Sequence, residues 1–430
     1  MGAPRSLISV TLCTEQNLSH DFGQSVVGFF CGSRAFVLER LPVPIKSISR
    51  SGASQDLERL VSQLLIFGFN GTELSTRLKT TISALQPGGI ILFARNIESP
   101  RQTHALLRSA QRLVADKMFL CVDMEGGTVD RLRDAVAPAP SVAEVFASQR
   151  PQLFREHGRV IGMEVRALGF NVDFAPVLDL SSEASEPVMR TRTASGFQDE
   201  TILYARHFLR GLRESGVLAC GKHFPGLGEA SLDSHQELPV VLKSWRELWL
   251  EDLRPYRTLK RELPLVMVAH CAYPSVTSDK TPASLSRKWI TEVLRRKIGY
   301  RGLIISDDLE MGGVLAAADI GDAAVETLRA GADIFLVCHK EENVWRTFYT
   351  VLAEAERDHR FRRQVEAAAE RSRRFKESCR ALNRPAVPPP TDAAIDKLRG
   401  ELWEFGEKLR LATAARATAV RVEESLGSSS

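Results

Sequence analysis

Eight short apolar runs, separated by segments long enough for a helix, constrain the fold of this 430-residue chain more than any other feature. Each run is nearly continuous in apolar residues, which is typical of parallel strands buried on both faces. We expect strands at 64–69, 89–93, 119–123, 171–177, 218–223, 265–270, 303–307 and 333–337. The segments between them include predicted helices at 245–259 and 286–297. Eight strand–helix units predict an α/β fold, the (β/α)8 TIM-type barrel.

The competing α/β fold is an open, doubly wound sheet. That fold usually carries a glycine-rich dinucleotide-binding turn after its first strand. Here the first predicted strand is followed by Asn70-Gly71-Thr72-Glu73, which does not match the fingerprint. The sequence therefore favours the closed barrel.

The chain divides into three predicted parts. Residues 1–53 form a poorly patterned N-terminal arm, residues 54–380 hold the barrel, and residues 381–430 form a proline-rich linker and a C-terminal helix. A stripe of apolar residues at alternating spacings of three and four marks that helix: Ile395, Leu398, Leu402, Phe405 and Leu409. We expect the stripe to pack against the barrel, and self-association through it is the alternative.

Charge and hydropathy argue against several classes of protein. Lys and Arg number 57 against 53 Asp and Glu, and a net charge of +4 is too small to indicate a nucleic-acid partner. No apolar run approaches the roughly 20 residues of a membrane span, and no secretory signal pattern is visible. The seven cysteines show no close pairing. We therefore expect a cytoplasmic protein with no membrane partner and no metal. We also expect a monomer that needs no cofactor, although none of these patterns determines the oligomeric state.

Ionisable residues gather where the predicted strands end. They are Asp123, Asp173, Lys222, His223, His270, Asp307 and Asp308. The C-terminal ends of barrel strands meet at one rim, which is where barrel enzymes place their active sites. An unpartnered buried carboxylate is too costly to be retained as packing. The ring therefore predicts a functional site, and a structural ion pair, such as Lys222 with an aspartate, is the alternative for any single member.

Two segments carry the groups best suited to chemistry. After His223, a loop rich in proline and glycine carries Asp233 and His235, whose i, i+2 spacing points both side chains the same way in an extended loop. There a carboxylate can orient an imidazole that gives and takes protons near neutral pH. A chance Asp-x-His pair in a solvated loop is the alternative.

The second segment, 303–311, delivers the adjacent acids Asp307 and Asp308 to the rim. Only one of two neighbouring side chains can point into a barrel mouth. A carboxylate fixed there can attack an anomeric carbon or stabilise an oxocarbenium ion. The alternatives are a divalent-cation site or a helix N-cap, with Asp308 as the capping residue.

These motifs resemble those of glycoside hydrolase family 3, and specifically its bacterial NagZ-type β-N-acetylglucosaminidase branch. The resemblance runs from about residue 64 to residue 311 and more weakly to about residue 375. It rests on motifs in the family's order at 87–96, 122–127, 171–179, 222–226, 233–235 and 306–311.

The resemblance implies a retaining exo-β-N-acetylglucosaminidase that removes terminal N-acetylglucosamine from peptidoglycan fragments in cell-wall recycling. Asp307 matches the nucleophile that forms a covalent glycosyl-enzyme, and His235 matches the acid/base, with Asp233 as its partner. Sugar-binding positions are matched by Asp123, Arg131, Arg192, Lys222 and His223. The implied partner is an N-acetylglucosamine-containing saccharide or muropeptide, and no metal or cofactor is implied.

The sequence also departs from the family pattern. The departures are Leu227 and Glu229 in the histidine-bearing loop, Thr128 after the Glu-Gly-Gly motif, and Arg190, which rivals Arg192. Three other functions stay open: a phosphorylase, another family 3 β-glycosidase, and a barrel that binds glycan without cleaving it. Only about 50 residues follow residue 380, too few for the α/β domain that supplies the acid/base in many β-glucosidases of the family. This favours the hexosaminidase branch.

Overall fold

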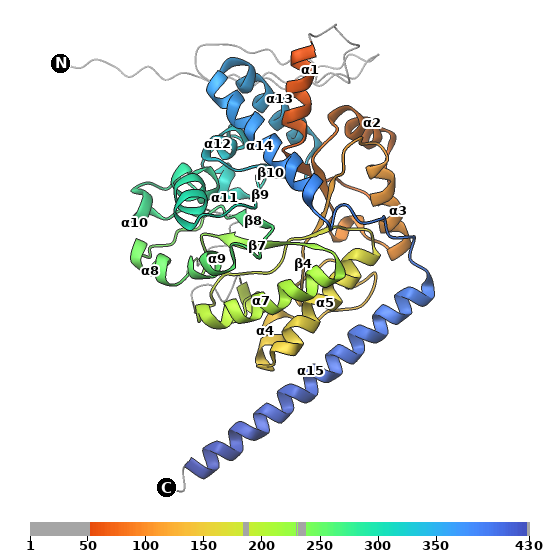
Figure 1. The fold of residues 1–430 in the computed structure, drawn as a ribbon, viewed down its shortest axis with the longest axis vertical. Coiled ribbons are helices and arrows are strands. Elements are labelled where there is room, and N and C mark those ends of the chain that lie inside the picture. The colour runs from red at the N-terminus through yellow and green to blue at the C-terminus, as the bar shows by residue number, and fades with distance from the viewer. Residues whose placement is uncertain (1–51, 184–188, 229, 231–237, 428–430) are drawn as a thin grey trace, which may run out of the picture. The chain divides into compact units, whose positions relative to one another are not determined.

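Eight parallel strands close into a barrel in the computed structural model, which describes residues 52–183, 189–228, 230 and 238–427 (Figure 1). They are β1 (Leu65–Phe67), β2 (Gly89–Ile91), β3 (Phe119–Val122), β6 (Val172–Asp173), β7 (Leu218–Phe224), β8 (Leu265–Val268), β9 (Leu303–Asp308) and β10 (Ile334–Val337). Hydrogen-bonded neighbours follow the order β1-β10-β9-β8-β7-β6-β3-β2. Each predicted run overlaps one of these strands, so the predicted (β/α)8 barrel is confirmed.

Alternate residues along each strand face the interior of the barrel. In β3, Phe119 and Cys121 belong to the interior cluster, whereas Leu120 and Val122 belong to the cluster between strands and helices. Both faces of each strand are therefore covered. This explains why the strands read as continuous apolar runs in the sequence.

Helices cover the outside of the barrel. The longer ones are α1 (Gly52–Ser62), α2 (Thr76–Leu85), α3 (Pro100–Gln111), α5 (Pro151–Ala167), α7 (Gln198–Ser215), η4 (Lys288–Ile298), α12 (Ile320–Ala330), α13 (Glu341–Arg357) and α14 (His359–Ser378). Short turns of helix are η1 (Ala94–Asn96), α4 (Val142–Ala147), η2 (Arg190–Arg192), α8 (Trp245–Leu250), α9 (Arg254–Leu259), α10 (Pro274–Thr277), η3 (Ala283–Leu285) and α11 (Gly312–Leu315). None of the described helices is long and apolar enough to cross a membrane.

The single helix predicted at 245–259 is wrong, because the structure has two short helices there. α8 ends at Leu250 and α9 begins at Arg254, with Pro255 in its first turn. Proline has no N–H to donate and restricts the residue before it, so it starts a helix more readily than it continues one. The predicted helix at 286–297 is confirmed as η4, which is wound as a π-helix.

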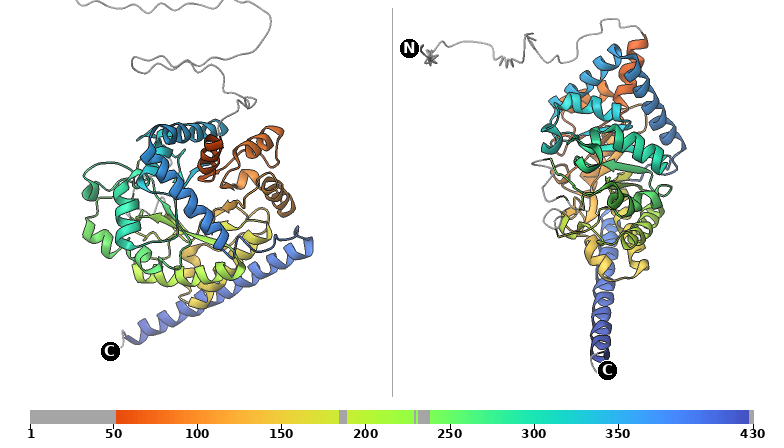
Figure 2. Two further views of the ribbon diagram at one scale, coloured as in Figure 1. Left: turned by 45° about the horizontal axis from the view of Figure 1, so that its top comes forward. Right: turned by 90° about the vertical axis from the view of Figure 1, so that its left-hand side faces the viewer.

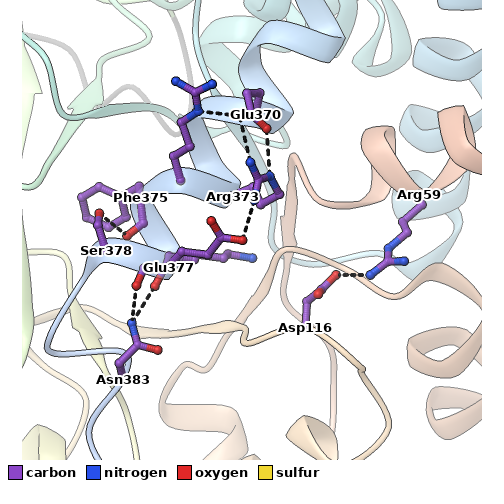
Figure 3. A network of polar contacts seen from close by, with 10 residues as sticks. Arg59, Asp116, Glu370, Arg373, Phe375, Glu377, Ser378 and Asn383 are labelled. Carbon is purple, nitrogen blue, oxygen red and sulfur yellow. Dashed lines mark hydrogen bonds and ion pairs between the residues drawn. The ribbon is translucent and has the colours of Figure 1, made fainter.

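The end of α14 closes the N-terminal end of the barrel. Leu382, just beyond that helix, joins the interior cluster of the strands. The Lys376 ammonium donates to the carbonyl oxygen of Gly88 at 3.0 Å, and burial lowers the pKa of Lys376 to about 8. Figure 3 shows Asn383 beside the last turn of α14, where its amide donates to carbonyl oxygens including that of Glu377 at 2.9 Å. The opposite end of the barrel, where the strands have their C-terminal ends, is where barrel enzymes place their active sites.

The C-terminal helix α15 (Asp392–Gly427) runs along α5 and α4 (Figure 2). All five residues of the predicted stripe are buried, and the Phe405 ring stacks on His157 of α5 at 5.8 Å. Burial lowers the pKa of His157 to about 3, so this imidazole is neutral at pH 7. Arg159 of α5 pairs with Glu401 at 2.8 Å. The predicted packing of this helix on the barrel is confirmed.

A two-stranded antiparallel sheet follows β3 and is additional to the barrel. It consists of β4 (Met124–Gly126) and β5 (Val129–Asp130). This hairpin carries Glu125 and leads directly to Arg131. The predicted arm at 1–53 lies outside the described residues except for its last two, where α1 begins, and the predicted domain limits stay a prediction.

Candidate active site

Predicted site residues stand at or just beyond the ends of three barrel strands. Asp123 follows β3, Lys222 and His223 lie near the end of β7, and Asp307 lies near the end of β9. Because the barrel strands are parallel, these ends belong to one mouth of the barrel. The structure therefore brings these side chains to the same end of the molecule.

A buried ion network lines this mouth. The Lys222 ammonium lies 2.7 Å from Asp123 Oδ1 and 2.6 Å from Glu125 Oε1. Arg192 donates to both oxygens of Glu125, each at 2.8 Å, from Nε and Nη2. The side chains of Lys222 and Glu125 are 3% and 1% exposed. The alternative prediction that Lys222 forms an ion pair with an aspartate is therefore confirmed. This ion pair lies at the mouth of the barrel, so it does not exclude a role for Lys222 in the site.

The network keeps its members charged in spite of burial. Burial acts to raise the pKa of Glu125, but Arg192 and Lys222 outweigh it and hold that pKa well below its ordinary value. Burial acts to lower the pKa of Lys222, but Asp123 and Glu125 outweigh it and hold that pKa above its ordinary value. Fixed charges in a site with little water interact strongly with polar ligands.

Asp173, at the end of β6, contacts the backbone of the β4–β5 hairpin that carries Glu125. Its Oδ1 accepts a hydrogen bond from the backbone N–H of Met124 at 2.9 Å, while Oδ2 is buried without a partner among the described residues. Burial raises the pKa of Asp173 well above its ordinary value. Asp173 thus holds the start of the β4–β5 hairpin through the backbone N–H of Met124.

His223 is fixed by a carboxylate that the sequence did not single out. Asp179 Oδ2 lies 2.7 Å from His223 Nδ1, and Asp179 Oδ1 accepts the backbone N–H of Leu227 at 2.8 Å. Asp179 is buried. It therefore ties the end of β7 to the start of the loop that continues toward Asp233 and His235.

Asp307 is partly exposed at the mouth. The backbone N–H of Asp308 donates to Asp307 Oδ1 at 2.8 Å. In the described part of the chain no ion pair involves Asp307, whereas Asp123 pairs with Lys222 and Asp308 lies 3.1 Å from His339 Nε2. A carboxylate held by one hydrogen bond keeps lone pairs available for a ligand.

Asp308 is not the N-cap of a helix, which was one alternative that the sequence left open. Helix α11 begins four residues later, at Gly312, and its N-cap is Met311. Asp308 Oδ1 instead accepts the backbone N–H groups of Glu310 at 3.0 Å and Cys338 at 3.1 Å. The capping alternative is therefore wrong. The Asp308 carboxylate accepts N–H groups from the turn after β9 and from the residue after β10, and none from the first turn of α11.

Arg131 follows β5 and reaches toward an aromatic residue after β2. Its guanidinium carbon lies 6.0 Å from the centre of the Phe93 ring, at the outer limit of a cation–π contact. Its Nε is buried and has no hydrogen-bond partner among the described residues. An arginine with a free donor beside an aromatic face is suited to a polar ligand.

Other predicted groups fall outside what the structure describes. The structure does not describe positions 229 and 231–237, which include Glu229, Asp233 and His235. It also does not describe the side chain of Arg190. Sequence reasoning also missed Glu125 and Asp179 as site residues. Glu125 lay within a motif already noted, and its signal was a charged residue between an apolar strand and two glycines.

The described side chains match a ligand with many hydroxyl groups. Carboxylates, a lysine and arginines supply directional donors and acceptors around one mouth. A free carboxylate beside them can act as a nucleophile. Among the described residues, no group of three His, Cys, Asp or Glu side chains is placed to hold a metal ion.

Residues 56–374 match the family model described as the glycosyl hydrolase family 3 N-terminal domain. The chain belongs to glycoside hydrolase family 3. A curated relative, a β-hexosaminidase of Pseudomonas aeruginosa, is 38% identical to this family 3 enzyme over 276 residues, which is 64% of this chain and 82% of the relative. The resemblance expected from the motifs is therefore confirmed.

Solved structures agree with the family assignment. A family 3 β-N-acetylglucosaminidase from Paenibacillus sp. str. FPU-7 superposes with a TM-score of 0.76 and 32% identity, covering 82% of this chain and 68% of that one. NagZ from Neisseria gonorrhoeae, in complex with N-trifluoroacetyl-D-glucosamine, has a TM-score of 0.61 and 29% identity, covering 72% of this chain and 98% of that one.

Proposed function

We propose that this family 3 glycoside hydrolase is a retaining exo-β-N-acetylglucosaminidase. In this proposal it removes terminal N-acetylglucosamine from peptidoglycan fragments. The observation that supports it most is the Asp307 carboxylate at the same barrel mouth as the buried ion network of Lys222, Asp123, Glu125 and Arg192. The activities named for the similar β-hexosaminidase and NagZ proteins point to the same sugar.

The ion network supports a role in holding the terminal sugar. Asp123, Arg131, Arg192, Lys222 and His223 are the residues proposed to bind its hydroxyl and acetamido groups. Lys222 and Arg192 are already oriented by carboxylates, so little conformational entropy is lost when the sugar binds. Preorganised groups of this kind favour the transition state most when their hydrogen bonds strengthen as charge develops.

The proposed reaction has two steps. Asp307 attacks the anomeric carbon while His235 gives a proton to the leaving oxygen, which breaks the glycosidic bond and leaves a covalent glycosyl-enzyme. Water then attacks the same carbon while His235 takes its proton, which releases Asp307. Two inversions restore the β configuration. Asp233 is proposed to orient His235 and to stabilise its charged form.

Product analysis tests the activity, the stereochemistry and the acceptor together. We expect the wild-type protein in phosphate buffer to convert an aryl β-N-acetylglucosaminide into free N-acetylglucosamine, with the β anomer appearing first in proton NMR spectra. A sugar 1-phosphate would identify a phosphorylase instead. Turnover of glucosides or xylosides alone would indicate another family 3 glycosidase, and binding without turnover would indicate a glycan-binding barrel.

Replacing His235 by alanine is expected to separate substrates by leaving group. General acid assistance contributes roughly 10²- to 10⁴-fold, and a leaving group that departs as a stable anion does not need it. We expect kcat/KM to fall by about 10²-fold or more on an N-acetylglucosaminyl disaccharide and by less than about 10-fold on a dinitrophenyl glycoside. His359→Gln, at an exposed position on α14, is the matched control. Equal losses on both substrates would show that His235 is not the acid.

Several finer expectations stay predictions. They are the cytoplasmic location, the monomeric state and the preference for a muropeptide on the leaving-group side. The first can be checked by cell fractionation and the second by light scattering. The third follows from comparing kcat/KM on disaccharides with and without a muramoyl peptide.

A further inference from the structure

A histidine that the proposed reaction does not use stands at one corner of the mouth. His339 lies two residues beyond β10, and its side chain is 52% exposed. Its ring stacks on Phe93, beyond the end of β2, with 5.8 Å between ring centres and 23° between planes. Its Nε2 lies 3.1 Å from Asp308 Oδ2. Because β9, β10, β1 and β2 are successive neighbours in the barrel, this corner joins their ends.

Asp308 connects the residues at this corner of the mouth. Its Oδ1 accepts the backbone N–H of Cys338 at 3.1 Å, and its backbone carbonyl oxygen lies 2.8 Å from His270 Nε2. Its own backbone N–H donates to Asp307 Oδ1 at 2.8 Å. The orientation of the Asp307 carboxylate therefore depends directly on where the Asp308 backbone is held.

We propose that His339 is a positioning residue for the reaction at Asp307. As an imidazolium it holds the Asp308 carboxylate at the end of β9, and the Asp308 backbone N–H in turn fixes Asp307 Oδ1. His339 touches neither the nucleophile nor, in this proposal, the anomeric carbon. The inference rests on the proposed function for its catalytic consequence, whereas the pairing of His339 with Asp308 is independent of it.

The charges around His339 favour its protonated form. Asp308 faces it from β9 and Glu310 from the turn after β9, while Arg95 of η1 opposes them. The hydrogen bond with Asp308 raises the pKa of His339 above its ordinary value, against the lowering effects of partial burial and Arg95. A raised pKa means that the stabilising contact is complete at low pH and is lost as pH rises through that pKa. The Asp307 carboxylate should therefore be held best at low pH and less well as pH rises through the pKa of His339.

The matched experiment uses three variants and an activated dinitrophenyl β-N-acetylglucosaminide. With that leaving group, kcat/KM reports formation of the glycosyl-enzyme and does not depend on proton transfer from His235. We expect wild-type kcat/KM to fall by roughly 10-fold as His339 loses its proton, because a small displacement of a reacting group has a large effect on rate.

Each variant then has its own expected dependence of kcat/KM on pH. In His339→Gln, kcat/KM should equal at every pH the low value that the wild type reaches when His339 is deprotonated. His339→Lys keeps a cation near Asp308 that stays charged well above neutral pH, so it should stay near the high value. His359→Gln should reproduce the wild-type profile. A wild-type profile in His339→Gln, or a fall in His339→Lys parallel to that of the wild type, would overturn the proposal.

A second measurement does not need turnover. The pKa of the His339 imidazole, followed by proton NMR, is expected above its ordinary value in the wild-type protein and lower in Asp308→Asn. An unchanged pKa in Asp308→Asn overturns the pairing itself. A wild-type protein that shows the pairing but turns over no N-acetylglucosaminide overturns the proposed function and, with it, the catalytic role of His339.

Discussion

Replacing Asp307 by asparagine is expected to lower kcat by about 10⁴-fold or more, because loss of a covalent nucleophile removes the route that the other groups serve. The amide oxygen of asparagine can still accept the N–H of Asp308, which donates to Asp307 Oδ1 at 2.8 Å. The fold and sugar binding should therefore persist. Steady-state kinetics on an aryl β-N-acetylglucosaminide, together with binding of N-acetylglucosamine by calorimetry, checks both parts.

A smaller side chain at the same position provides a sharper control. In Asp307→Gly the space of the carboxylate is open to a small anion, and azide can attack the anomeric carbon from that face. The C–N bond would form as the aryloxide leaves, giving the α-glycosyl azide by one inversion. Asp134→Asn, at an exposed position, should behave as the wild type. Substantial hydrolysis by Asp307→Asn, or a β-azide product, would place the nucleophile elsewhere.

Replacing Lys222 by methionine is expected to lower the free energy of unfolding by about 3–5 kcal/mol. Methionine fills much of the same volume, so the change removes the charge and little packing. It leaves Asp123 without its cationic partner and Glu125 with Arg192 alone. Urea denaturation at pH 7 measures the difference from the wild type.

The pH dependence of that difference identifies its electrostatic origin. In the wild type the pKa of Glu125 is lowered, so its stabilising contribution is present above the ordinary pKa of a glutamate and is lost as pH falls below it. The gap between wild type and Lys222→Met should therefore shrink in acid. Lys288→Met breaks a half-exposed pair with Glu292 at 3.3 Å and should change stability by less than about 1 kcal/mol. Equal effects of the two variants would contradict the buried network.

The position of an ionisable residue at a strand end carried most of the site information in the sequence. Asp123, Lys222, His223 and Asp307 could be predicted because parallel strands must end at one rim. The pairing of Glu125 with Lys222 and of Asp179 with His223 could not be predicted, because a single sequence does not show which acid will lie against which cation. His339 was missed for a related reason: its partner Asp308 is 31 positions away, and only the neighbouring of β9 and β10 brings them together.

The sequence by itself determined the eight strands, their parallel arrangement, the rim that bears the ionisable groups and the apolar stripe of α15. These follow from local periodicity and from the need to bury both faces of each strand. Only the tertiary structure decided which charges pair, which carboxylate stays free and where proline divides the predicted helix at 245–259 into α8 and α9. Pairing depends on distances between residues far apart in the chain, and a few ångströms in a poorly solvated interior change the sign and size of an electrostatic contribution.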